Sequence, residues 1–201
     1  MHALLISASP SERSRSAALL DAAGLALAQA GIGTSGLALR TLPAESLLHA
    51  RSRDAVLRGA LEQVAAASAL VIATPIYKAA YSGLLKVFLD LLPQDALHDT
   101  WVWPLATGGS PAHTLAIDHA LRPVLDNLAA HQVVPSVFAL DAQLVWSGAT
   151  AHLDAAIQAR LSAGAARLAR GLGAHAPRPA APDVAARIPL PAIAGAARCS
   201  A

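Results

Sequence analysis

The chain has 201 residues and a formal net charge of +2, and 55% of its residues are hydrophobic. This length suits one domain with a well-buried core, or one such domain followed by a tail. The basic residues are scattered along the chain, so no nucleic-acid partner is expected. A single cysteine, Cys199, excludes an internal disulfide and a metal site built from cysteines.

The hydrophobic residues do not form a membrane span. The longest apolar stretch, residues 64–76, is interrupted by Ser68, Thr74 and Pro75. A spanning helix needs roughly 18–20 uninterrupted apolar residues. The N-terminus leads into its first apolar run without a basic segment, unlike a signal peptide. We therefore expect a cytoplasmic protein with no membrane partner.

Short apolar runs alternate with longer segments of helical periodicity, which is typical of an α/β domain with a parallel sheet. In chain order, the predicted elements are strand 3–7, helix 15–30, strand 34–39, helix 57–67, strand 69–73, helix 82–92, strand 101–106, helix 113–130, strand 133–138 and helix 153–172. Five strands with intervening helices predict a flavodoxin-like, doubly wound, five-stranded parallel sheet of order 2-1-3-4-5.

The composition changes after the last predicted helix. From Gly173 to Ala201, alanine and proline dominate the sequence. Such a segment is typical of an extended or mobile tail, with docking in an oligomer as an alternative. We therefore predict one domain over residues 1–172 and a tail over residues 173–201.

Ligands of such sheets bind beyond the carboxyl ends of the strands, at the switch point between strands 1 and 3. The first loop there, residues 8–16, opens a helix whose free N–H groups and partial positive charge suit a phosphate. It has neither a Walker motif nor a dinucleotide-binding glycine pattern, so a monophosphate fits better than a triphosphate. Simple helix capping by Ser14 or Ser16 is the alternative. The candidate phosphate ligands are Ser9, Ser14, Arg15 and Ser16.

The second loop, residues 74–82, follows the most apolar strand. Both tyrosines and both lysines of the chain lie in the stretch 74–86. Tyr77 can lie against a flat ring, and polar loop residues on a rigid scaffold often carry function. For Lys86, an exposed helix position or a salt bridge is the simpler interpretation. The candidate ligand contacts of this loop are Pro75, Ile76, Tyr77 and Lys78.

The third loop, residues 107–113, contains paired glycines. Glycines let the backbone approach a ligand and expose its N–H groups. Such donors suit the pyrimidine edge of an isoalloxazine, where negative charge develops on reduction. Taken alone, the loop is more simply explained as a tight turn that enters a helix. Its candidate ligand contacts are Thr107, Gly108, Gly109 and Ser110.

Together these loops resemble the NAD(P)H-dependent FMN reductases of two-component alkanesulfonate monooxygenase systems. The similarity covers roughly residues 1–172 and is most specific in its middle motifs. The matching stretches are Ser9-Pro10, Ser14-Arg15-Ser16 and residues 73–86, 89–93, 104–109 and 116–125.

This resemblance implies that the first loop holds the phosphate of FMN and that the isoalloxazine ring lies between the second and third loops. It also implies a homo-oligomer, a dimer or a tetramer, that supplies reduced flavin to a flavin-dependent sulfonate monooxygenase. Hydride passes from the nicotinamide of NADPH or NADH to the flavin, and the sequence does not choose between the two. Because the cofactors carry this step, no catalytic side chain is predicted.

The resemblance also singles out His119. The best-known alkanesulfonate reductases have a tyrosine there, in a one-residue π-helical insertion at the tetramer interface that helps keep the flavin exchangeable. Methanesulfonate-type relatives have a histidine, so this sequence is more similar to them. We expect His119 at an oligomer contact that affects flavin exchange, with an ordinary interface histidine as the alternative. Periodicity does not decide whether the π-helical insertion is present.

Two other functions remain open on the sequence. A quinone, azo-dye or chromate reductase with tightly bound FMN would use the same scaffold. A non-enzymatic flavodoxin-like carrier would use it as well, although the pI of about 9.1 counts against this because flavodoxins are usually acidic.

Overall fold

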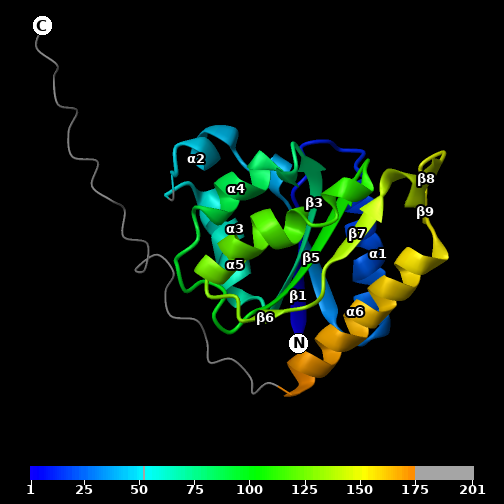
Figure 1. The fold of residues 1–201 in the computed structure, drawn as a ribbon. Helices are drawn as coiled ribbons and strands as arrows, with labels where there is room; N and C mark the ends of the chain where they lie inside the picture. The colour runs from blue at the N-terminus through cyan, green and yellow to red at the C-terminus, as the bar shows by residue number, and fades with distance from the viewer. Residues whose placement is uncertain (52, 175–201) are drawn as a thin grey trace, which may run out of the picture.

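A mostly parallel sheet forms the middle layer of the computed structural model, which describes residues 1–51 and 53–174 (Figure 1). The main path of the sheet is β2-β1-β3-β5-β6, β7 also pairs with β5, and β4 pairs antiparallel with β3. The strands are β1 (His2–Ser7), β2 (Gly33–Ala38), β3 (Ala69–Tyr77), β4 (Ala80–Tyr81), β5 (Trp101–Gly108), β6 (Gln132–Val133) and β7 (Val137–Leu140).

The flavodoxin-like α/β fold is confirmed, and the predicted strand order is matched in part. The first four predicted strands correspond to β1, β2, β3 and β5 and occupy the predicted places. The fifth place is shared by β6 and β7, because the chain leaves the ladder between them. Pro135 lies in this gap and has no N–H with which to continue the ladder.

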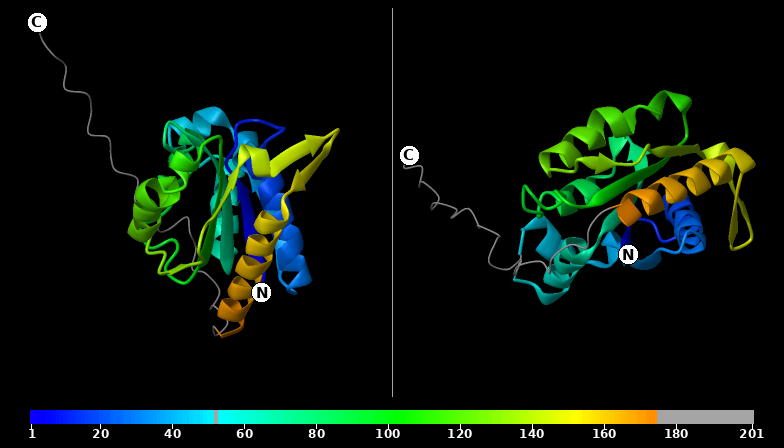
Figure 2. Two further views of the ribbon diagram at one scale, coloured as in Figure 1. Left: turned by 45° about the vertical axis from the view of Figure 1, so that its right-hand side comes forward. Right: turned by 90° about the horizontal axis from the view of Figure 1, so that it is seen from below.

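Helices cover both faces of the sheet (Figure 2). The buried residues form two clusters, one between the sheet and α1 and α6, the other between the sheet and α3, α4 and α5. Along β3, Leu70 and Ile72 belong to one cluster and Val71 and Ala73 to the other. This continuous apolar run is typical of a parallel strand buried on both faces. The α-helices are α1 (Arg15–Gln29), α2 (Ala44–Leu48), α3 (Ala55–Ala66), α4 (Gly83–Leu89), α5 (Arg122–Asn127) and α6 (Ala155–Ala174).

Two glycines let α6 lie close to the sheet. Gly164 and Gly171 are two helical turns apart on α6, and they face Trp103 and Trp101 of β5. A Cβ atom at either glycine would overlap the facing indole ring. The tryptophans are two residues apart and so point to the same face of the sheet. Their pairing with the glycines therefore fixes the position of α6.

The predicted helix 113–130 is wrong as a single helix. The 3₁₀ helix η2 (Pro111–His113) precedes a π-helix, η3 (Ile117–Leu121), which leads directly into α5. The N–H of Arg122 bonds to the carbonyl of Ile117, five residues back. Pro123 has no N–H to donate to the carbonyl of residue 119, which favours such a local rearrangement.

Several other elements differ from the sequence-based expectation. The predicted helix 153–172 is shifted by two residues, so that α6 ends at Ala174, and the rest of the predicted tail lies outside the described residues. A separate antiparallel hairpin precedes it, formed by β8 (Leu144–Ser147) and β9 (Thr150–Leu153). Two further 3₁₀ helices are η1 (Leu39–Thr41) and η4 (Asp141–Gln143).

Candidate functional site

A pocket of about 240 Å³ lies at the carboxyl edge of the sheet, where β1, β3, β5 and β7 end. The three predicted loops meet there. The predicted residues that line it are Ser9, Ser14, Arg15, Pro75, Ile76, Tyr77, Thr107, Gly108 and Gly109, and the lining residues that the sequence did not single out are Ser11, Arg13 and Asp141.

Buried serines organise the first loop. Ser14 is the N-cap of α1, and its hydroxyl accepts a hydrogen bond from the N–H of Ala17 at 3.4 Å. The hydroxyls of Ser14 and Ser16 lie 2.9 Å apart, and that of Ser9 accepts from the N–H of Ser11 at 3.1 Å. Ser16 is fully buried and does not line the pocket. It supports Ser14 from behind. Ser14 therefore caps α1 and also lines the pocket, and its predicted contact with a phosphate stays a prediction.

Two arginines bring positive charge to the part of the pocket formed by the first loop, and each has a different partner. Arg15 forms an ion pair with Asp141, with 3.6 Å between Nη1 and Oδ2, and both side chains are about half exposed. Arg13 donates to the carbonyl of Gly148 at 2.6 Å, and its guanidinium lies 4.6 Å from the centroid of the Trp146 ring. The β8–β9 hairpin thus holds Arg13 through an uncharged carbonyl and an aromatic face.

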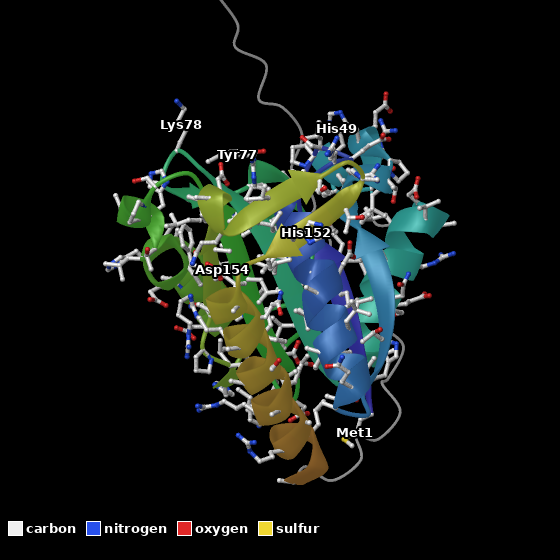
Figure 3. All side chains as sticks on the ribbon, turned by 90° about the vertical axis from the view of Figure 1, so that its right-hand side faces the viewer. Met1, His49, Tyr77, Lys78, His152 and Asp154 are labelled. Carbon is white, nitrogen blue, oxygen red and sulfur yellow. The ribbon has the colours of Figure 1, made fainter. Side chains whose placement is uncertain are left out.

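The second loop is a tight hairpin between β3 and β4. Tyr77 pairs with Ala80, and the two residues between them, Lys78 and Ala79, have φ of 51° and 64°. Tyr77 is 51% exposed. Figure 3 shows Lys78 at the tip of the hairpin, pointing away from the body of the protein. Lys78 does not line the pocket, and its predicted ligand contact stays a prediction.

Hydrogen bonds tie this hairpin to the first loop. The hydroxyl of Thr74 accepts from the N–H of Ser82 at 3.0 Å. The hydroxyl of Ser82 donates to the carbonyl of Ala8 at 2.7 Å, and it accepts from the N–H of Leu85 as the N-cap of α4. The first two loops are therefore fixed relative to each other by buried polar contacts.

The third loop brings backbone rather than side chains to the pocket. A Cβ atom on Gly108 would lie 3.0 Å from the Phe138 ring, so glycine allows β5 to pass close to β7. Gly109 is exposed and lines the pocket beside Asp141. Ser110 caps η2 by accepting from the N–H of Ala112 at 3.3 Å and does not line the pocket.

His119 lies outside the pocket, exposed on the π-helix. The structure thus shows a π-helix at this position, which periodicity left undecided. The predicted role of His119 in oligomer contacts and flavin exchange stays a prediction.

Lys86 has the simpler role considered for it. It forms an i,i+4 ion pair with Asp90, 2.6 Å from Nζ to Oδ1, and this hydrogen bond raises the pKa of Lys86.

Within residues 1–51 and 53–174, no helix has the length and apolar character of a membrane span. In the same part of the chain, no three His, Cys, Asp or Glu side chains are grouped to hold a metal ion.

Comparison with known proteins places this chain in a family. The family model described as NADPH-dependent FMN reductase matches residues 1–144. The chain is 43% identical over 181 residues to the FMN reductase (NADPH) of Pseudomonas putida strain KT2440, covering 89% of this chain and 91% of that protein. It is 44% identical over 145 residues to the FMN reductase (NADPH) of Escherichia coli K12, covering 72% of this chain and 76% of that protein.

A solved structure agrees with these relatives. The apo form of the NADH:FMN oxidoreductase EMOB has a TM-score of 0.78 and 37% identity to this chain, covering 87% of this chain and 91% of that one. The chain therefore belongs to the NADPH-dependent FMN reductase family.

Proposed function

We propose that this member of the FMN reductase family reduces FMN with NADPH or NADH and supplies it to a separate flavin-dependent sulfonate monooxygenase. The observation that carries the proposal is that one pocket has two ends that differ in chemistry. One end offers buried serine hydroxyls and two arginines, and the other offers glycine backbone and a half-exposed tyrosine. A phosphorylated molecule with a flat ring fits this combination.

The phosphate belongs at the end formed by the first loop. There Arg13 and Arg15 supply charge, and the α1 N-terminus supplies N–H groups. Ser9 and Ser14 are nearly fully buried and fixed by hydrogen bonds, so they lose little freedom when a phosphate binds.

The ring belongs at the end formed by the second and third loops. Tyr77 presents half of its surface to solvent beside the pocket, and Gly108 and Gly109 allow close approach to the backbone. When bound, FMN accepts a hydride from the nicotinamide, and the residues of the chain orient the ring and hold its phosphate. No side chain of the pocket is required to transfer a proton in the hydride step.

The partner and the assembly are supported by the sequence motifs alone. The resemblance to alkanesulfonate-type reductases supports a sulfonate monooxygenase as partner. It also supports a dimer or tetramer with His119 at a contact between subunits. We extend to this chain the use of both nucleotides, because the similar proteins are named for NADPH and for NADH.

The decisive experiment measures NADPH and NADH oxidation with FMN, FAD and riboflavin, on protein whose flavin content after purification is known. The proposal expects nearly colourless protein that oxidises nicotinamide only when flavin is added. Addition of a sulfonate monooxygenase and its substrate should then release sulfite. A yellow protein that keeps FMN through gel filtration and reduces quinones or azo dyes would instead support the rival enzyme, and flavin binding without nicotinamide oxidation would support the carrier.

A further inference from the structure

Asp141 places a negative charge in the pocket that we assign to a phosphate. It is the first residue of η4, directly after β7. Its carboxylate forms an ion pair with Arg15 and lies 3.6 Å from the position of a Cβ atom on Gly109. Asp141 therefore stands between the first loop and the third loop, at the junction of the two ends of the pocket.

A phosphate monoester at this position would face that charge directly. It carries a charge of about −1.5 to −2 at neutral pH. If it binds Arg15, it must share the guanidinium with the carboxylate of Asp141 or displace it. Two anions at one cation repel each other, and the pair is only half exposed, so solvent does not screen this repulsion completely.

Arg13, the neighbouring arginine, differs from Arg15 because its partners are uncharged. Arg13 is held by the carbonyl of Gly148 and the ring of Trp146, neither of which carries a formal charge. A phosphate can approach Arg13 without displacing an anion. The first loop thus contains one arginine with uncharged partners and one with an anionic partner.

We propose that Asp141 competes with the phosphate of FMN for Arg15 and so keeps the affinity for FMN low enough for the flavin to leave. The inference rests on the proposed function, because it requires FMN in this pocket. A carboxylate here weakens the hold of a prosthetic group but suits an enzyme that releases its flavin. Asp141 is therefore an affinity-setting residue, not a catalytic one.

The sign of one mutational effect tests this inference. We expect Asp141→Asn to bind FMN about two- to fivefold more tightly, a change typical of one half-exposed charge contact. FMN dissociation should slow, and the gain should shrink at high salt because the effect is electrostatic. Riboflavin, which lacks the phosphate, should bind the variant and the wild type equally. Quenching of flavin fluorescence gives both affinities, and stopped-flow displacement gives the dissociation rate.

A matched control and a second variant keep the test sharp. Glu62→Gln removes one negative charge from the half-exposed Arg58–Glu62 pair on α3, 3.8 Å from Nε to Oε1, and should leave both flavin affinities unchanged. Asp141→Ser removes the charge without adding an amide and should reproduce the tighter binding of FMN. Thermal melting of each variant shows whether it is folded.

Each other outcome overturns the inference in a recognisable way. Weaker FMN binding in Asp141→Asn would mean that Asp141 orients Arg15 for the phosphate. Equal changes for FMN and riboflavin would mean that Asp141 contacts the ribityl chain or the ring. Unchanged affinity for FMN would mean that Asp141 does not reach the phosphate. If the wild type binds neither flavin, the proposed function fails; if it binds FMN and Asp141→Asn does not tighten it, only the role of Asp141 fails.

Discussion

The two ends of the pocket are built by different means. The end proposed for the phosphate is formed mainly by side chains. They are buried serine hydroxyls and two arginines, and the partners of these arginines lie outside α1. At the end proposed for the ring, backbone dominates, because Gly108 and Gly109 have no side chains and Tyr77 belongs to a two-residue hairpin. The first end is organised by charge and the second by shape.

This difference determines how each end is tested. Charge at the phosphate end acts only on a ligand that carries a phosphate, so FMN and riboflavin should respond differently to changes there. Shape at the ring end acts on the isoalloxazine, which both flavins share. The ratio of the two affinities therefore assigns a residue to one end or the other.

The largest effect is expected for Arg15→Ala. Loss of a charge-assisted contact costs about 1.5–3 kcal/mol, which corresponds to roughly 10- to 150-fold weaker FMN binding. The variant also leaves the carboxylate of Asp141 without its ion-pair partner and therefore more repulsive to a phosphate. Riboflavin affinity should not change, and titration calorimetry measures both ligands.

Arg58→Ala is the matched control, because Arg58 is a half-exposed arginine in an ion pair on α3, outside the pocket. It should bind both flavins like the wild type. An unchanged FMN affinity in Arg15→Ala would remove Arg15 from the site, and an equal loss for riboflavin would assign it to the ring end.

A smaller loss of affinity, shared by FMN and riboflavin, is expected for Tyr77→Ala. Stacking of a flat ring on an aromatic side chain is worth about 1–3 kcal/mol, and the lower half of this range suits a tyrosine that stays half exposed. Both flavins should lose affinity by the same factor. Tyr77→Phe keeps the ring and should bind like the wild type. A loss confined to FMN would contradict the assignment of Tyr77 to the ring end.

Much of this fold follows from short-range patterns in the sequence. The apolar run that begins at Ala69 predicts a buried parallel strand, and the serine caps Ser14 and Ser82 mark where α1 and α4 begin. The rule that parallel sheets bind ligands at their carboxyl edge then brings three loops together. The family resemblance adds the identity of the ligand, which no single loop establishes.

The features that escaped prediction depend on long-range contacts or unusual backbone. Lys78 and Ala79 both have positive φ, which their residue types rarely adopt, so the hairpin after β3 has no sequence signal. Asp141 enters the pocket because β7 pairs with the end of β5, a long-range contact that local sequence patterns do not predict. Arg13 lies in the first loop, but its orientation depends on a hairpin more than 130 residues away in the chain.

The smallest of the three effects is expected for a substitution in this distant β8–β9 hairpin. It tests the contact between the hairpin and Arg13 of the first loop. We expect Trp146→Leu to weaken FMN binding by about two- to fivefold, because an exposed cation–π contact is worth about 0.5–1 kcal/mol and its loss frees Arg13 to move. Riboflavin should bind as before, since Trp146 acts through an arginine at the phosphate end.

Val145 supplies the control for this prediction. It precedes Trp146 on β8, is 58% exposed, and points to the opposite face of the hairpin. Val145→Ala should therefore alter the hairpin surface without touching Arg13 and leave both affinities unchanged. If Trp146→Leu lowers the affinity for both flavins, the hairpin supports the pocket as a whole. The assignment of Trp146 to the phosphate end would then be wrong. If it lowers only the affinity for FMN, the charge at the phosphate end depends on an element outside the central sheet.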